Sequence, residues 1–191
     1  MAMPQPLAPP GPAPRPYWTP ADVLALPPDG QRYEVAHGEL LVTPAPDPGH
    51  QFVLSALYDR LQPWLRAQGL GRCCWSPADL RFGPMTLLQP DLFVVPAALA
   101  RVTRWEDVRQ LLLVVEALSP STARHDRFTK RRCYQEAGVP AYWILDAGQR
   151  HVEVWTPADS TPQVVQDVLT WQPAGATAAL VIDLPELFDG A

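Results

Sequence analysis

The chain has 191 residues, 47% of them apolar, which is enough for the core of one domain and too many for a disordered chain. Its net charge of −5 and its pI of about 5.3 exclude a broad basic face that coats nucleic acid, but not local contacts to a few phosphates. No apolar stretch is long enough to cross a bilayer and no signal-peptide pattern is present, so we expect a soluble protein without membrane contact.

Taken in chain order, residues 1–16 are crowded with proline and are expected to form an extended or disordered tail, followed by a single domain over 17–191. Thr19 and Pro20 predict the cap and first residue of a short helix that ends near Leu26. Strand patterns at 32–35 and 39–42 flank a turn and predict a hairpin.

A long helix is expected to begin at Asp47-Pro48 and to end near Gln68, because apolar residues recur at helical spacing from Val53 to Trp64. Pro63 falls inside this helix and predicts a kink or an early end. Cys73, Cys74 and Cys133 are an odd set with two adjacent members, so we expect reduced thiols and a cytoplasmic location.

The remaining pattern predicts further strands around one central strand. The run 111–116 is continuously apolar, as expected for a strand covered on both faces. A helix follows from the hydroxyl-rich segment 119–122 to about Ala137. Shorter strands are predicted at 73–75, 79–82, 91–95, 142–145 and 151–155, with a weaker pair and a turn of helix in 158–191. The fold class is therefore α/β, a mixed β-sheet flanked by helices.

Two carboxylates stand at strand boundaries. Asp91 opens a strand after Pro90, and Glu116 closes the most hydrophobic strand of the chain. A buried, unpaired carboxylate is costly, so Glu116 must meet an arginine, the lysine or a metal ion. Lys130 is the one lysine among 15 basic residues, which hints that an ammonium rather than a guanidinium is required there.

The helix after Glu116 brings Asp126, Lys130 and Tyr134 to one face at four-residue spacing. If this face turns towards Glu116, two carboxylates, a backbone carbonyl and a lysine form an oxygen-rich site suited to Mg²⁺ or Mn²⁺. In the alternative interpretation, Glu116 and Lys130 form a buried ion pair and Asp91 caps a turn. Spacing alone does not decide between the two.

The motifs around these residues resemble one family. In the second half they are Val115-Glu116-Ala117-Leu118-Ser119-Pro120-Ser121-Thr122, Asp126-Arg127, Lys130, Tyr134, Ala137-Gly138-Val139-Pro140 and Tyr142-Trp143-Ile144-Leu145-Asp146. Upstream they are Tyr33-Glu34, Gly38-Glu39-Leu40, His50 and Pro90-Asp91. In this order, over about residues 17–157, they are similar to the "putative restriction endonuclease" family that is abundant in cyanobacteria, within the PD-(D/E)XK nuclease superfamily.

This resemblance implies a restriction-endonuclease-like core with a metal held by Asp91, Glu116 and the Ala117 carbonyl. The superfamily signature asks for lysine two residues after Glu116, where this chain has Leu118. In this family the lysine has moved to the next helix, at Lys130, which agrees with the argument from the single lysine.

Several further residues have two interpretations each. Glu39 is an additional catalytic carboxylate or a solvated hairpin residue. His50 is a ligand or proton carrier, or a polar residue that satisfies a helix end. Tyr134 contacts a phosphate or packs in the core. The basic cluster of Arg124, Arg127, Arg131 and Arg132 contacts DNA phosphates or is a solvated helix face.

The implied function is metal-dependent endonucleolytic hydrolysis of DNA, with a homodimer expected by analogy because two active sites allow cleavage of both strands. One alternative is a catalytically inactive member of the same fold that binds DNA or protein. Another is an unrelated metal-dependent hydrolase that acts on a small phosphodiester.

Overall fold

The structure is a computed structural model that describes residues 17–119 and 121–190. The tail expected at 1–16 lies outside this part of the chain. None of the helices in these two described segments is long and apolar enough to span a membrane.

Within the described residues, the largest sheet has six strands in the spatial order β10-β9-β8-β7-β6-β3. The strands are β3 (Gly71–Trp75), β6 (Leu92–Pro96), β7 (Leu113–Ala117), β8 (Tyr142–Asp146), β9 (His151–Trp155) and β10 (Gln163–Val165). β7 pairs with β8 in parallel, and the other neighbours pair antiparallel. The predicted mixed sheet is confirmed, and the apolar run 111–116 supplies β7, an interior strand that is buried throughout.

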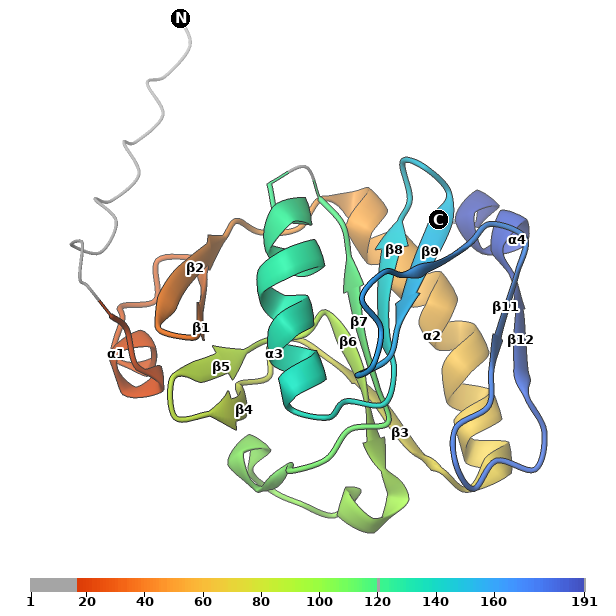
Figure 1. The fold of residues 1–191 in the computed structure, drawn as a ribbon, viewed down its shortest axis with the longest axis horizontal. Coiled ribbons are helices and arrows are strands. Elements are labelled where there is room, and N and C mark those ends of the chain that lie inside the picture. The colour runs from red at the N-terminus through yellow and green to blue at the C-terminus, as the bar shows by residue number, and fades with distance from the viewer. Residues whose placement is uncertain (1–16, 120, 191) are drawn as a thin grey trace, which may run out of the picture.

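A second sheet lies towards the N-terminus, with the order β2-β1-β5-β4 among the described residues (Figure 1). Its strands are β1 (Arg32–Ala36), β2 (Glu39–Thr43), β4 (Leu80–Gly83) and β5 (Thr86–Leu88). β1 and β2 form the predicted hairpin, with positive φ angles at His37 and Gly38 in the turn. The preceding helix α1 (Pro20–Leu24) begins at the predicted cap, where Thr19 accepts a hydrogen bond from the Asp22 backbone N–H.

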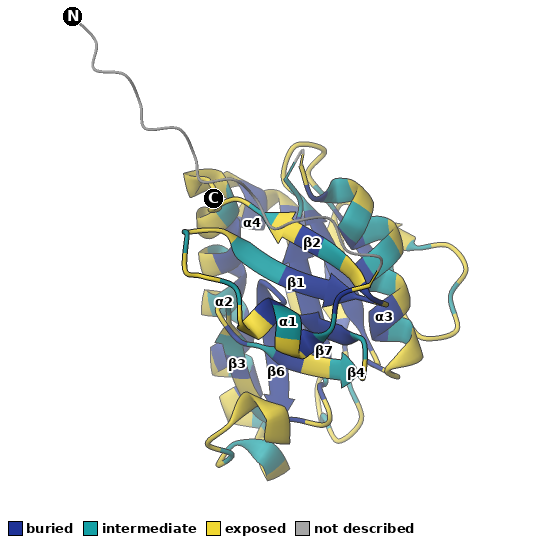
Figure 2. Cartoon of the chain, turned by 90° about the vertical axis from the view of Figure 1, so that its left-hand side faces the viewer, coloured by how far each residue is buried: buried dark blue, intermediate teal, exposed yellow. Residues whose placement is uncertain are grey.

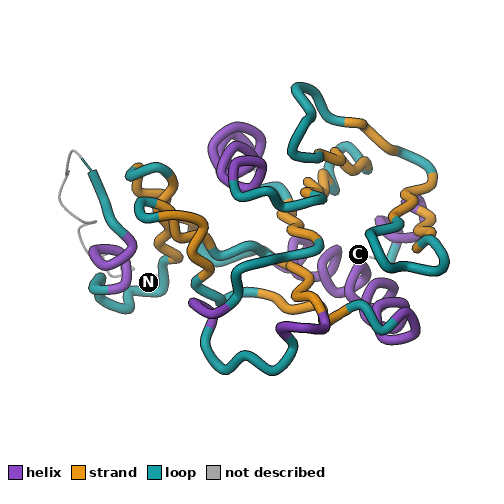
Figure 3. The backbone as a smooth tube through the Cα atoms, turned by 60° about the horizontal axis from the view of Figure 1, so that its bottom comes forward, coloured by secondary structure: helices purple, strands orange, loops and turns teal. Residues whose placement is uncertain are grey.

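Helix α2 (Pro48–Gln68) covers one face of the six-stranded sheet (Figures 1 and 3). Asp47 caps its first turn, and Gly69 ends it in the left-handed conformation. The helix continues through Pro63 rather than ending early, because its buried stripe, which includes Leu57, Leu61 and Leu65, packs on the sheet on both sides of that position.

The opposite face is covered by one helical segment, predicted as a single helix to about Ala137. It begins with a turn, winds as a π-helix η3 (His125–Lys130) and continues as α3 (Arg131–Glu136). The two faces take alternate strand residues into separate cores, for example Val115 on the α2 side and Val114 on the α3 side. Figure 2 shows β6 and β7 in the colour of buried residues, with β1 in front of them changing from intermediate to buried along its length.

The remaining elements lie at the edges. The predicted loop 96–110 contains two 3₁₀ turns, η1 (Ala97–Leu99) and η2 (Trp105–Asp107). Near the C-terminus, β11 (Val168–Trp171) and β12 (Leu180–Asp183) form the expected strand pair, followed by helix α4 (Leu184–Asp189). Arg60 of α2 pairs with Glu186 at 3.0 Å and helps to hold α4 against the long helix.

Candidate active site

Asp91 and Glu116 lie side by side at the ends of two paired strands. The antiparallel register of β6 and β7 places Leu92 opposite Val115, so the residues just beyond that pair become neighbours. The Asp91 backbone N–H donates to Glu116 Oε2 at 3.4 Å, and the Ala117 N–H donates to Asp91 Oδ2 at 3.0 Å. The three positions predicted to hold a metal are therefore in direct contact.

Lys130 reaches the same place from the helical segment on the α3 face. Its Nζ atom lies 3.1 Å from Glu116 Oε1, 3.1 Å from Glu34 and 3.5 Å from Asp126, and the side chain is only 1% exposed. Tyr134, one turn further on, donates its hydroxyl to Glu116 Oε1 at 2.8 Å. The π-helical winding of η3 sits at this point, as such irregularities often do at functional sites.

Glu34 belongs to a motif that carries the family resemblance, but the sequence analysis assigned it no role in the site. It comes from β1, is fully buried and accepts a hydrogen bond from the Gln89 N–H at 2.7 Å in addition to the contact with Lys130. Arg32, two residues earlier on the same strand face, lies 3.7 Å from Glu34. The sequence does contain one signal for this pair: two charged residues two positions apart lie on the same face of a strand.

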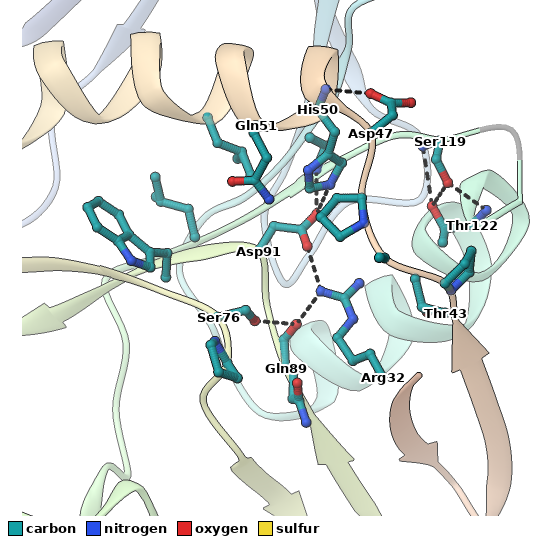
Figure 4. A pocket seen from close by; sticks show the side chains of 18 of the residues that line it. Arg32, Thr43, Asp47, His50, Gln51, Ser76, Gln89, Asp91, Ser119 and Thr122 are labelled. Atoms are coloured by element: carbon teal, nitrogen blue, oxygen red, sulfur yellow. Dashed lines mark hydrogen bonds and ion pairs between the residues drawn. The ribbon is translucent and has the colours of Figure 1, made fainter. Parts of the chain in front are cut away.

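Arg32 and His50 contact Asp91 from the side of the pocket (Figure 4). The Arg32 guanidinium is 2.7 Å from Asp91 Oδ1, and His50 Nε2 is 2.9 Å from Asp91 Oδ2. The backbone N–H of His50 is one of the free donors at the start of α2, and the Asp47 side chain accepts its hydrogen bond, so Asp47 satisfies the helix end. The His50 side chain instead contacts a predicted metal ligand.

The electrostatics differ between the two acids. Burial raises the pKa of Glu116 well above its usual range, against the opposing effect of Lys130. Burial also raises the pKa of Asp126. At Asp91 burial is outweighed by the hydrogen bond with His50 and by the charge of Arg32, which hold the pKa of that carboxyl well below its usual range. The acidic groups around Lys130 raise the pKa of its ammonium despite burial.

The charges of this cluster do not balance. Among the described residues, four buried carboxyl groups meet here (Glu34, Asp91, Glu116 and Asp126), whereas the permanent cations are Arg32 and Lys130. With all four carboxyls ionised the excess is two negative charges, which a divalent cation would neutralise. Carboxylate and carbonyl oxygens are also the ligands that Mg²⁺ and Mn²⁺ prefer.

The residues thus fit a hard divalent cation in charge and in donor type. Within residues 17–119 and 121–190, no three His, Cys, Asp or Glu side chains already converge as a metal site. Both oxygens of Asp91 are engaged by Arg32, His50 and the Ala117 N–H. An ion that binds Asp91 must therefore share this carboxylate with Arg32 and His50 or displace one of them.

A pocket of about 1050 Å³ opens in front of Asp91. Arg32, His50, Asp91 and Ala117 line it, together with residues of β3, the α2 face and the 119–122 segment. Figure 4 shows Asp91 at its centre, with Gln51 and His50 above it and Arg32 below. Glu116 and Lys130 are almost completely buried and lie behind Asp91.

Glu39 lies away from this cluster. It is exposed and pairs with Ala36 at the turn of the hairpin, whereas Arg32 at the other end of β1 contacts Asp91. Four residues of strand correspond to roughly 13 Å. The structure does not bring Glu39 to the carboxylates, and its position is that of a solvated hairpin residue.

The residues predicted to contact phosphate are placed differently from one another. Arg124 is exposed. Arg127 bonds to Asp146 and Glu153, and Arg131 bonds to Gln135 and lies 4.7 Å from the centre of the Trp155 ring. Tyr134 is completely buried. Of these side chains, Arg124 is the one that faces solvent without an acidic partner among the described residues.

A model of the Uma2 family, whose description is "Putative restriction endonuclease", matches residues 20–185. The chain belongs to this family. The match covers β1, Asp91, Glu116 and Lys130 together, so every element that builds the carboxylate cluster lies within the family's own boundaries.

Among solved structures, one described as a "putative nuclease belonging to DUF820" from Anabaena variabilis is similar to this chain. Its TM-score is 0.72 at 22% sequence identity, with 90% of this chain and 98% of that chain covered. At this identity the likeness shows the fold alone, a mixed α/β fold that the two proteins share. No curated protein matches the chain.

Proposed function

We propose that this protein is a metal-dependent endonuclease that hydrolyses DNA phosphodiester bonds. The observation that carries the proposal is the contact between Asp91 and Glu116 at the edge of a large pocket, with the single lysine 3.1 Å from Glu116. Family membership supports the same chemistry. The excess of two negative charges supports a divalent cation, Mg²⁺ or Mn²⁺, as cofactor.

Asp91, Glu116 and the Ala117 carbonyl would hold this ion. When bound there, it supplies Lewis-acid polarisation of a phosphate oxygen and lowers the pKa of water. Lys130 and Tyr134 orient the Glu116 carboxylate through their two contacts with Oε1. Lys130 also favours the ionised form of Glu116. Its ammonium would in addition stabilise the negative charge that develops on the phosphate.

Arg32 and His50 have roles on the pocket side of Asp91. The Arg32 guanidinium lines the pocket and would offer a substrate phosphate a two-pronged donor. His50 is placed to carry a proton to or from the reacting groups. Arg124 is proposed to contact the DNA backbone, and a homodimer would present two such sites to two strands.

The test is nicking of supercoiled plasmid in Mg²⁺ or Mn²⁺ by the wild type, Asp91→Asn and Lys130→Ala. Asp91→Asn keeps the shape of the side chain but removes its charge, so we expect a loss of about 100-fold or more. Asp59→Asn is the matched control, because Asp59 is exposed on α2. Nicking by Asp91→Asn at the wild-type rate would contradict the assignment.

One observation favours a second function, the catalytically inactive binding member of the fold. Arg32 and His50 already satisfy Asp91, as they would in a site that never binds an ion. Isothermal titration with Mn²⁺ separates the two. The nuclease proposal requires binding that Asp91→Asn abolishes, whereas an inactive binder shows neither metal binding nor nicking.

A further inference from the structure

Trp75 is an exposed aromatic side chain at the mouth of the pocket. It is the last residue of β3, and its side chain is 55% exposed. Tyr58 of α2 holds it in an edge-to-face contact, with ring centroids 4.5 Å apart and an interplanar angle of 64°. This contact fixes the orientation of the indole and leaves much of its surface open.

The strand register connects Trp75 to the carboxylates. Trp75 pairs with Leu92 across β3 and β6, and the next residue, Ser76, donates its backbone N–H to the Asp91 carbonyl at 3.3 Å. Both Trp75 and Asp91 line the same pocket. The aromatic surface is therefore adjacent to the proposed cleavage site.

The two ends of the pocket differ in chemistry. Of the described residues that line it, the basic ones are Arg32 and His50, and both contact Asp91. Apart from these residues, the lining includes Trp75, Pro77 and one face of α2, where Gln51, Leu54, Ser55 and Tyr58 recur at intervals of three to four residues. Because Tyr58 contacts Trp75, this part of the pocket offers flat apolar surface with amide and hydroxyl groups on the same helix face.

We infer that the Trp75 end of the pocket binds an unpaired nucleobase by stacking, and that the substrate is single-stranded or locally unpaired DNA. The inference rests on the proposed function, because it places the scissile phosphate at Asp91. Every base presents a flat π-face to an indole once it has left the helical stack. The polar groups of Gln51 and Ser55 suit the edge of such a base.

The charges of the chain agree with this choice of substrate. Binding duplex DNA through its backbone depends on many cationic contacts to phosphates. This chain has a net charge of −5, and Arg127 and Arg132 of the most basic helical segment are paired with acids. Stacking supplies affinity that does not require a basic surface.

The experiment measures anisotropy of a fluorescein-labelled 12-nucleotide single strand, the same strand with abasic residues, and the blunt duplex. EDTA is present so that no strand is cut. The full chain is compared with Trp75→Ala, Trp75→Phe and Phe52→Ala. Phe52 is a matched control, because it is equally exposed at 56% but does not line the pocket. Thermal melting confirms that each variant folds.

We expect the wild type to bind the single strand more tightly than either the abasic strand or the duplex. Trp75→Ala should lose about tenfold in affinity for the single strand, within the range of roughly 5- to 150-fold per stacked base. It should lose little for the abasic strand, since no base is there to stack. Trp75→Phe should retain most of the affinity, and Phe52→Ala should match the wild type.

Equal losses on the normal and abasic strands, no loss at all, or tighter binding to duplex would overturn the inference. Its failure is separable from failure of the nuclease proposal. Plasmid nicking that is abolished by Asp91→Asn but unaffected by Trp75→Ala preserves the nuclease and removes the base site. Binding of single strands that depends on Trp75, without any metal-dependent cleavage, preserves the base site and removes the nuclease.

Discussion

Two of the basic side chains in the helical segment on the α3 face, Arg127 and Lys130, lie three residues apart, and each contacts more than one acid. Arg127 bonds to Glu153 in the middle of β9 at 2.6 Å and to Asp146 at the end of β8 at 3.0 Å. Lys130 contacts Glu116 and Glu34 at 3.1 Å, with Asp126 at 3.5 Å. The chemistry is similar, but the Arg127 side chain is 32% exposed and that of Lys130 is 1% exposed.

This difference in burial separates a structural ion pair from a candidate catalytic one. The Arg127 side chain is partly exposed, so solvent screens its ion pairs. The Lys130 cluster is buried, so the pKa values of Glu116 and Asp126 are raised, and a cation would neutralise the surplus charge that these acids carry when ionised. If burial causes this difference, substitution of the basic residues in this segment should lower the free energy of unfolding most at the most buried residue and least at the most exposed one.

Lys130→Met is expected to have the largest effect. It leaves three buried carboxyls without their cation, and loss of one partner of a buried ion pair costs about 3–5 kcal/mol. The free energy of unfolding, measured with urea at neutral pH, should fall by that amount. A Lys130→Met, Glu116→Gln double variant should regain part of the loss, because one of the stranded charges is gone. No regain would contradict the electrostatic explanation.

The stability lost in the Lys130→Met variant should depend on pH in a defined direction. Because the pKa values of Glu116 and Asp126 are raised, the folded chain binds more protons than the unfolded chain above the usual pKa of these acids. The free energy of unfolding therefore falls as pH rises towards the raised pKa values. Without Lys130 these values rise further, so the difference between variant and wild type should widen from pH 5 to pH 8.

Arg127→Met should have an intermediate effect, about 1–2 kcal/mol, because Glu153 is buried whereas Asp146 and Arg127 itself are partly exposed. His151, 3.8 Å from Glu153, softens the loss. The urea midpoint measured in parallel with that of Lys130→Met provides the comparison. If the two variants were equally destabilised, burial would not be what distinguishes the two clusters.

Some elements of the fold could be predicted from the sequence and others could not. Hydrophobic periodicity and capping residues predict α2, the central strand β7 and the β1–β2 hairpin, because those signals are local. The three-residue strand β5 was missed because it is too short for a pattern, and a residue pattern does not distinguish the π-turns of η3 from α-helix.

For the site, strand ends and the single lysine pointed to Asp91, Glu116 and Lys130, and the family resemblance implied their roles. Neither Glu34 nor Arg32 was assigned to the site, because they reach the cluster through pairing of β1 with β5, which joins Val35 to Leu87 across the sequence. Such long-range pairing has no local signature. The engagement of Asp91 by Arg32 likewise joins residues that are distant in sequence, and it became visible only with the fold.

Arg132→Ala is expected to have the smallest effect and tests the exposed end of the series. Arg132 bonds to Glu136 one turn away at 2.7 Å, a shorter contact than any that Lys130 makes, but its side chain is 70% exposed. If contact distance governed the contribution of an ion pair, this change would rival the loss of Lys130. If burial governs it, the urea midpoint should stay within error of the wild type, at both low and high salt, because bulk water already solvates both partners. A shift comparable to that of Arg127→Met would show that proximity rather than burial orders the three basic residues, and the distinction between the two clusters would no longer hold.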